Sequence, residues 1–408
     1  MSPQGRVCWE TPLTNPGQDF HSWSGPILAG DSAILDSDSH VFSVDLSNGK
    51  VDWEWMSAAP PIVSSGGGGG NEIVAVVGGV VVATKEAHGN SYVVGLDEST
   101  GALRWQRGSA MCCPSDTGKG SVFFAFNKSQ QLEIQAWADR TGATLWSTTV
   151  GPANGSIFPT VGDGLVLGYA NGNWAVNAAT GKLQWRDSTS SEAVIPFDGL
   201  LVAPPTPGPI GPSEFDVPAL GIDPTTGATL WSTPPLPQGQ WHFVGTGGDL
   251  MQLASGMPGS TPPFVYKGGF LARIDLSTGK TTWSVPTFPY VVSAAGDVVA
   301  DIESTAYDAG ASSLVGRNAT TGAVLWRVPL DSPHPWAGLL RTVQGPVGSQ
   351  FLLENAYQGD QVTAYDAQTG AQAWTLQLPD ANLDAVTPVP GGGVVVQACE
   401  VNCVQPSH

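Results

Sequence analysis

The chain has little positive charge. Of its 408 residues only 16 are lysine or arginine, against 35 aspartates and glutamates, which gives a formal net charge of −19 at pH 7. A strongly negative surface repels phosphate groups. The composition therefore argues against nucleic acids and anionic lipids as partners, and we expect a monomer that stays in solution.

Long hydrophobic runs are also missing. No segment approaches the roughly 20 apolar residues that a membrane helix requires, and Met1-Ser2-Pro3 does not begin a secretory signal. We therefore expect no membrane insertion. Two locations stay open: extracellular or cell envelope with the leader removed, or cytoplasmic.

Cysteine is scarce, and five residues carry it: Cys8, Cys112, Cys113, Cys399 and Cys403. The last two are close enough for a disulfide that closes a short turn, although Cys8 competes if the ends of the chain meet. An odd number leaves one thiol outside any pairing within the chain. Because disulfides persist in oxidising compartments, the cysteines favour the extracellular or envelope location.

What the chain does contain is a repeated motif, Asp-x-x-Thr-Gly-x-x-x-Trp. It occurs eight times, and its tryptophans are Trp53, Trp105, Trp146, Trp185, Trp231, Trp283, Trp326 and Trp374. Their spacings of 39 to 52 residues suit a four-stranded sheet with three tight turns and one longer connection. The sequence predicts an all-β fold, a single β-propeller domain of four-stranded blades over residues 1–408.

The residue types of the motif suit a hairpin turn. Glycine accepts a positive φ, while the aspartate or asparagine and the threonine can bond the turn backbone. The third copy carries Ala138 at the acidic position, so we expect a distorted turn there. The tryptophan follows on the next strand, where it can pack between sheets and bury about 150–250 Å².

This repeat resembles the tryptophan-docking motif of the PQQ-like, quinoprotein-type β-propellers, and the resemblance covers nearly the whole chain. The family includes quinoprotein alcohol dehydrogenases, BamB-type outer-membrane assembly lipoproteins and sensor domains of some bacterial kinases. The resemblance implies the fold but not the function, because the same fold serves enzymes and binding scaffolds.

The ends of the chain affect the number of blades. Residues 5–9 look like the second half of a ninth copy, and residues 375–408 look like the first half. A literal count gives nine blades, whereas the family usually closes with seven or eight. We expect eight blades with partly redundant terminal pieces, closed by pairing of the N- and C-terminal strands, which removes an open sheet edge.

The vicinal Cys112 and Cys113 are the sharpest hint of an enzyme. Quinoprotein alcohol dehydrogenases have such a pair at a similar place, so the resemblance implies a strained disulfide covering a bound PQQ, with calcium nearby. The match is imperfect, because five residues instead of four precede Lys119-Gly120, where the family has Arg-Gly. The family's calcium ligands and catalytic Asp are not recognisable by motif. Alternatively, the two cysteines are small buried residues in a loop.

A second pattern follows from the phase of the repeat. The segment 7 to 14 residues after each docking tryptophan carries aromatic, histidine and cysteine residues: His21, Trp23, Cys112, Cys113, Phe158, Trp241, His242, Tyr290, His334 and Trp336. Equivalent propeller loops gather at one end of the central channel, where such groups suit a small-molecule site. The alternative is that they plug the channel or begin strands. No short ligand spacing supports a histidine metal site.

Two functions therefore stay open. One is a binding module that holds a small molecule, glycan or protein at the channel mouth. The other is an enzyme at that mouth, such as a quinoprotein dehydrogenase oxidising alcohols or sugars with PQQ and calcium. Acids such as Asp301, Glu303 and Glu354 could act as acid-base groups if they reach the channel, but we expect each at a solvated surface.

Overall fold

The computed structural model describes most of the chain. The described residues are 7–13, 25–36, 40–56, 72–87, 90–108, 114–118, 120–152, 160–169, 172–187, 194–197, 199–203, 218–233, 239–246, 249–256, 270–286, 292–304, 312–330, 340–345, 348–355, 361–377, 381–389 and 393–400. All regular elements among them are β-strands, as the sequence predicts. Within these residues there is no helix long and apolar enough to cross a membrane.

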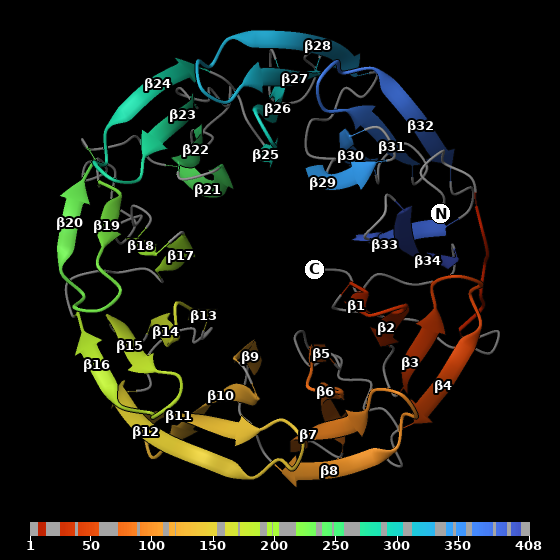
Figure 1. Ribbon diagram of the computed structural model, residues 1–408, viewed down its shortest axis with the longest axis vertical. Helices are drawn as coiled ribbons and strands as arrows, with labels where there is room; N and C mark the ends of the chain where they lie inside the picture. Colours follow the sequence, from red (N-terminus) through yellow and green to blue (C-terminus); the bar gives the residue numbers. More distant parts are fainter. Residues whose placement is uncertain are drawn as a thin grey trace, which may run out of the picture.

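The strands form antiparallel sheets that stand around a ring (Figure 1). In each four-stranded sheet the strands run in chain order from the centre of the ring to its rim. The first sheet contains β1 (Ile27–Ala29), β2 (Ser32–Asp36), β3 (His40–Asp45) and β4 (Val51–Met56), and the second contains β5 (Glu72–Val77), β6 (Val80–Ala87), β7 (Asn90–Asp97) and β8 (Leu103–Gly108). The third sheet contains β9 (Pro114–Gly118), β10 (Ser121–Lys128), β11 (Gln131–Ala138) and β12 (Thr144–Pro152). The fourth contains β13 (Thr160–Gly162), β14 (Leu165–Tyr169), β15 (Asn173–Asn177) and β16 (Leu183–Arg186).

Sheets five to eight repeat this order, and a ninth sheet has two strands. The fifth sheet contains β17 (Ile195–Phe197), β18 (Leu200–Ala203), β19 (Leu220–Ile222) and β20 (Thr229–Ser232), and the sixth contains β21 (Gly239–Thr246), β22 (Asp249–Gly256), β23 (Phe270–Asp275) and β24 (Thr281–Pro286). The seventh sheet contains β25 (Val292–Ala295), β26 (Val298–Ser304), β27 (Ser312–Asn318) and β28 (Val324–Leu330), and the eighth contains β29 (Leu340–Gly345), β30 (Gly348–Asn355), β31 (Gln361–Asp366) and β32 (Gln372–Gln377). The ninth sheet contains β33 (Ala381–Val389) and β34 (Gly393–Glu400).

The motif turns join the third strand of each four-stranded sheet to the fourth. In the second sheet the Gly101 N–H donates to the Asp97 carbonyl at 2.8 Å, and Asp97 Oδ1 accepts the N–H groups of Ser99 and Thr100 at 3.0 Å each. The expected distortion of the third copy is wrong. The Gly142 N–H still donates to the Ala138 carbonyl at 2.8 Å, because this bond needs only main-chain atoms and a glycine of positive φ.

Each motif tryptophan reaches across to the next sheet. Trp53 lies against Gly101, and its Nε1–H donates to the Glu98 carbonyl at 2.7 Å. The same contact recurs around the ring with N···O distances of 2.6–3.0 Å, made by Trp105, Trp146, Trp185, Trp231, Trp283 and Trp326. Burying one indole contributes roughly 4–6 kcal/mol as an upper bound.

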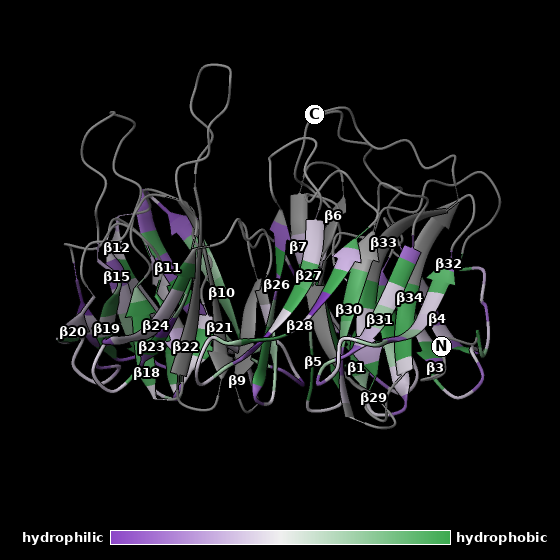
Figure 2. Cartoon of the chain, turned by 90° about the horizontal axis from the view of Figure 1, so that it is seen from above, coloured by the Kyte–Doolittle hydropathy of each residue, from purple (hydrophilic) through white to green (hydrophobic). Residues whose placement is uncertain are grey.

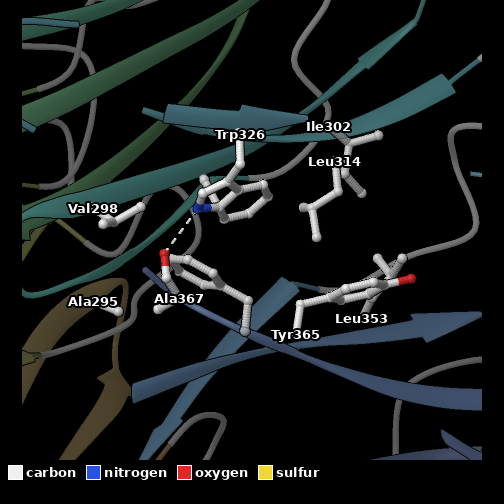
Figure 3. Packing of buried hydrophobic residues seen from close by; sticks show 10 residues of the cluster. Ala295, Val298, Ile302, Leu314, Trp326, Leu353, Tyr365 and Ala367 are labelled. Carbon is white, nitrogen blue, oxygen red and sulfur yellow. Dashed lines mark hydrogen bonds between the residues drawn. The ribbon is translucent and has the colours of Figure 1, made fainter. Parts of the chain in front are cut away.

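The apolar cores lie between neighbouring sheets and not inside any one of them. Figure 3 shows the core between the seventh and eighth sheets, where Trp326 donates to the Ala367 carbonyl beside Tyr365 and Leu353. Similar clusters join every consecutive pair of sheets. Each sheet therefore depends on both neighbours for its burial.

The number of blades differs from the prediction. The described residues form eight four-stranded sheets and a ninth sheet of β33 and β34, so the expectation of eight blades with redundant ends is wrong. The terminal pieces add a sheet because both have apolar partners. Val386 and Val394 pack on the eighth sheet, while Val395 packs with Trp9 on the first. The four-stranded blades of the prediction are confirmed.

The ends of the described chain meet at this ninth sheet. Trp9 lies against Gly49 of the first sheet and donates to the Leu46 carbonyl at 2.9 Å, as a fourth-strand tryptophan does elsewhere. Thr387 Oγ1 donates to the Pro26 carbonyl at 3.1 Å. The contact between the two ends in residues 7–13 is side-chain packing, and the strand pairs of β33 and β34 do not include this segment.

Gly227→Ala tests the indole contact. A Cβ there would lie 2.6 Å from the Trp185 ring, whereas Gly164 has a similar positive φ and nothing within 4 Å. Gly164→Ala should cost about 1–2 kcal/mol of backbone strain, and Gly227→Ala should cost about 1–3 kcal/mol more because the ring must move. Thermal unfolding of both variants measures the difference, and equal losses would contradict the docking role of the glycine.

Asp97→Asn tests the turn electrostatics. The Ser99 hydroxyl and then the Arg104 guanidinium lower the pKa of Asp97 below its ordinary value. A lowered folded-state pKa stabilises the fold above the unfolded value of about 3.9, and this stabilisation is lost as pH falls through the folded pKa. Asn177 makes the same turn bonds, so the variant should fold and should show a shallower acid dependence of stability. An ordinary pKa for Asp97 by NMR titration would refute this.

Candidate functional site

The two ends of the ring differ in how the strands are connected. Because successive strands run in opposite directions, the motif turns and the turns from first to second strands share one end, which we call the turn face. The connections from each fourth strand to the next first strand, and from second to third strands, share the other end, which we call the mouth face. Figure 2 shows the sheets from the side, with their largely apolar strands spanning the two faces.

Two predicted site residues lie on a described strand. Trp241 and His242 are in β21, the innermost strand of the sixth sheet, opposite Ala254 and Leu253 of β22. They are the third and fourth residues of a strand that begins at the mouth face. Their backbone therefore borders the central channel near its mouth (Figure 1).

The other eight predicted site residues lie outside the described residues: His21, Trp23, Cys112, Cys113, Phe158, Tyr290, His334 and Trp336. The strands that follow their segments are described. These are β1, β9, β13, β25 and β29, all innermost strands. That these eight residues gather at the mouth face stays a prediction.

Asn173 shows how one such connection is held. It is fully buried at the start of β15, on the mouth face of the fourth sheet. Its carbonyl accepts the Asp187 N–H at 2.8 Å, and its Oδ1 accepts the Val194 N–H at 3.2 Å. One side chain and its backbone therefore fix both ends of the segment that joins the fourth sheet to the fifth. The motif gives no sign of this contact, because Asn173 lies outside it.

The described residues do not supply a calcium site. Within them, no three histidine, cysteine, aspartate or glutamate side chains converge to hold a metal ion. They also contain no disulfide, and Cys112, Cys113 and Cys403 fall outside them. The calcium and PQQ that the resemblance implies therefore stay a prediction.

Charged side chains do gather at one place in the seventh sheet, on β26, β27 and β28. Arg317 Nε donates to Asp301 Oδ1 at 3.3 Å, and its second amino group pairs with Glu303. Arg327 holds the other Glu303 oxygen at 2.7 Å. Asp301 is fully buried and Arg317 is 5% exposed. The expectation of a solvated surface role is therefore wrong for Asp301, because Arg317 compensates its burial; the Glu354 side chain lies outside the described residues.

The sequence carried a signal for this network. The residue before the acidic motif position is apolar in the other seven copies: Val44, Leu96, Trp137, Val176, Ile222, Ile274 and Tyr365. Arg317 alone is charged there, and a buried arginine needs a carboxylate nearby. Because Asp301 and Glu303 are both engaged in ion pairs within the seventh sheet, they are not poised as acid-base groups.

Arg317→Val should be strongly destabilising. It leaves Asp301 buried without its guanidinium, a change that typically costs about 3–5 kcal/mol. The double variant Asp301→Leu/Arg317→Val copies Leu35 and Val44 of the first sheet and keeps Arg327 beside Glu303. It should recover most of the lost stability in thermal unfolding. If the double variant stays as unstable as Arg317→Val, the role of Arg317 is more than pairing with Asp301.

The comparisons with known proteins agree with this architecture. The sequence model of a family described as outer membrane protein assembly factor BamB matches residues 2–118, 90–203, 216–384 and 310–404. No curated protein matches the chain in sequence. The crystal structure of the computationally designed Ika8 protein is similar with a TM-score of 0.51 and 15% identity, over 80% of this chain and 92% of that one.

Two natural proteins show weaker similarity. BamB from Moraxella catarrhalis has a TM-score of 0.43 and 17% identity, over 75% of this chain and 81% of that one. A europium-containing methanol dehydrogenase has a TM-score of 0.47 and 14% identity, over 91% and 87%. The family model covers most of the chain and the ring repeats one type of blade, so the chain belongs to the BamB-like family of PQQ-like β-propeller repeat proteins, which confirms the resemblance of its tryptophan motif.

Proposed function

We propose that this chain is an extracellular or cell-envelope binding module that holds its ligand or protein partner at the mouth face. The observation that carries the proposal is that the turn face and the mouth face are built from different kinds of connection. The turn face is built from one motif that recurs with the same main-chain bonds. The mouth face receives the connections that differ in length and sequence from blade to blade.

The residue types of these connections support binding. Aromatic and imidazole side chains provide apolar surface together with a few hydrogen-bonding groups, which is the usual lining of a ligand site. Trp241 and His242 belong to this set and lie near the mouth end of an innermost strand. The other members precede innermost strands, and we propose that they complete a ring around the channel mouth.

The family description supports a location and a class of partner. Its name, outer membrane protein assembly factor, refers to a protein of the envelope that works with other proteins. We therefore favour a protein or glycan of the envelope as the partner.

One observation favours a second candidate, a quinoprotein dehydrogenase. Cys113 directly precedes Pro114, the first residue of the innermost strand β9. In this second candidate we propose that the vicinal cysteines lie at the channel mouth and that their disulfide covers a quinone. Against this candidate, Asp301 and Glu303 of the seventh sheet are held by arginines.

The test compares variants of the two faces. Wild-type protein is applied to an oligosaccharide array and a peptide array, and the strongest hits are measured against Trp241→Ala, His334→Ala and, on the turn face, Lys182→Ala. The mouth variants should weaken binding at least about tenfold, since each removes a contact worth about 1.4 kcal/mol. Lys182→Ala should not.

Two outcomes would contradict the binding proposal. One is equal loss in the turn-face control, and the other is no binding to either array. In parallel, the protein is incubated with PQQ and calcium. A bound visible chromophore with dye-linked alcohol oxidation that disappears in Cys112→Ser would establish the dehydrogenase instead.

A further inference from the structure

β12 is the longest of the eight fourth strands that the structure describes. It spans nine residues, whereas the others span four to seven. It lies at the rim of the ring and, among the described strands, pairs with β11 alone (Figure 1). Thr144, Leu145, Ser147 and Thr149 are exposed along it, and the exposed fraction of Leu145 is 53%. β12 therefore presents an exposed row of side chains at the edge of the third sheet.

The composition of β12 is unusual for an edge strand. Charged residues and proline normally keep edge strands from pairing with other chains. β4 carries Asp52 and Glu54, and β8 carries Arg104 and Arg107. β12 has no charged residue, and its only proline is Pro152, the last residue of the strand. The strand thus lacks both kinds of protection along most of its length.

Apolar side chains extend this surface onto the fourth sheet. Trp146 is partly exposed and lies against Gly181, whose carbonyl accepts the Thr148 hydroxyl. Leu183 follows two residues later, at the start of β16, and is 39% exposed. Two exposed leucines therefore belong to one surface, which consists of β12 and Leu183 and which we call the β12 edge.

The charge of the chain is unevenly distributed. Residues 114–187, which include the third and fourth sheets, contain five acidic and five basic residues and have a net charge of 0. Of the 35 acidic and 16 basic residues of the chain, the remaining 30 and 11 lie elsewhere and carry the whole formal charge of −19. The eighth sheet, whose shorter strand β32 is also uncharged, has three acidic residues and one basic residue between 340 and 377. Because like charges repel, two copies of this chain meet less resistance at their β12 edges than the net charge indicates.

We infer that the β12 edge is an interface between two copies of this chain. The two β12 strands pair antiparallel across a two-fold axis, which joins two four-stranded sheets into one of eight strands. Ser147 lies opposite its own copy, so Leu145 meets Thr149 of the partner subunit and the exposed leucine is covered. Such a pair is self-complementary when no like charges oppose one another, and β12 meets that condition. The dimer replaces the monomer expected from the net charge, and its interface lies at the rim, outside the proposed binding site at the channel mouth.

The dependence on salt distinguishes this interface from one held by ion pairs. Two copies of charge −19 repel each other at long range, and salt screens that repulsion. The paired strands are uncharged, so salt removes no attraction between them. Analytical ultracentrifugation of the full-length protein should show a dimer whose dissociation constant falls severalfold as sodium chloride rises from about 0.05 to about 0.5 M. An interface of ion pairs would weaken instead.

Two matched lysine variants locate the interface. Ser147 and Ser284 each follow a partly exposed docking tryptophan, on β12 and β24, and both are exposed. Ser147→Lys brings two lysines together at the two-fold axis and should raise the dissociation constant of the dimer at least about tenfold, which corresponds to about 1.4 kcal/mol. Ser284→Lys should leave it unchanged. Ser147 bonds to the Glu133 carboxylate, so an introduced lysine has a partner within its own sheet, and circular dichroism should show both variants folded.

Disulfide cross-linking tests the pairing directly. Directly opposed residues of antiparallel strands have Cα atoms about 4.5–5.5 Å apart, which lies within the range of about 4.4–6.8 Å found in disulfides. Mild oxidation should therefore link Ser147→Cys into a covalent dimer on a non-reducing gel. Ser284→Cys, with the same native cysteines, should run as a monomer on that gel.

Three results would overturn the inference. The first is a monomer at every salt concentration. The second is a dimer that Ser147→Lys leaves intact or that Ser284→Lys weakens equally, because the contact would then lie elsewhere. The third is a covalent dimer of Ser284→Cys as abundant as that of Ser147→Cys, because the pairing would then be unspecific.

Discussion

The structure depends on the contact between an indole and the glycine of the next blade. A flat ring needs an equally flat surface, and a glycine of positive φ in a tight turn provides one without a Cβ. The indole N–H then finds the carbonyl three residues before that glycine. Shape and polarity are satisfied together, so the buried indole N–H has a main-chain acceptor in the eight docking contacts that the described residues show.

This contact makes the fold a chain of nearest-neighbour interactions. In the described part of the chain, no cluster of buried residues spans more than two sheets, and the sheets are joined in one circle. The free energy of unfolding of such a protein is approximately the sum of the contributions of its individual blades and of the interfaces between them. A blade can therefore tolerate a different chemistry, as the seventh sheet does with Asp301 and Arg317, provided that the new groups satisfy one another.

The motif predicted the fold because its information is local. Gly101 and Trp105 are four residues apart, so the turn, the strand and its position at the rim follow from one short segment. The number of blades could not be read in this way. It depends on whether Val386 and Val395, far from Trp9 in sequence, complete two interfaces in space. We expected eight blades because the family usually closes with seven or eight. Counting the two terminal half-motifs as one further copy gives nine, which is the number of sheets in the described residues.

The candidate site was predictable only in its placement. The phase of the repeat predicts the segment of Cys112 and the strand of Trp241 at the same face, and the structure describes the two innermost strands β9 and β21. Which side chains meet there is set by connections that differ in every blade and carry no motif. Asn173 illustrates the difficulty, because the hydrogen bonds that it accepts from Asp187 and Val194 become visible only in three dimensions.

The difference between the turn face and the mouth face explains where function can change in this protein. A substitution in a motif turn disturbs two blades at once, since the turn carries the glycine and the carbonyl for its neighbour's tryptophan. A substitution in a mouth-face connection alters no docking contact among the described residues. The mouth face can therefore acquire aromatic, cysteine or histidine side chains at little cost to the ring. Binding or chemistry is expected at this end because the other end is committed to holding the blades together.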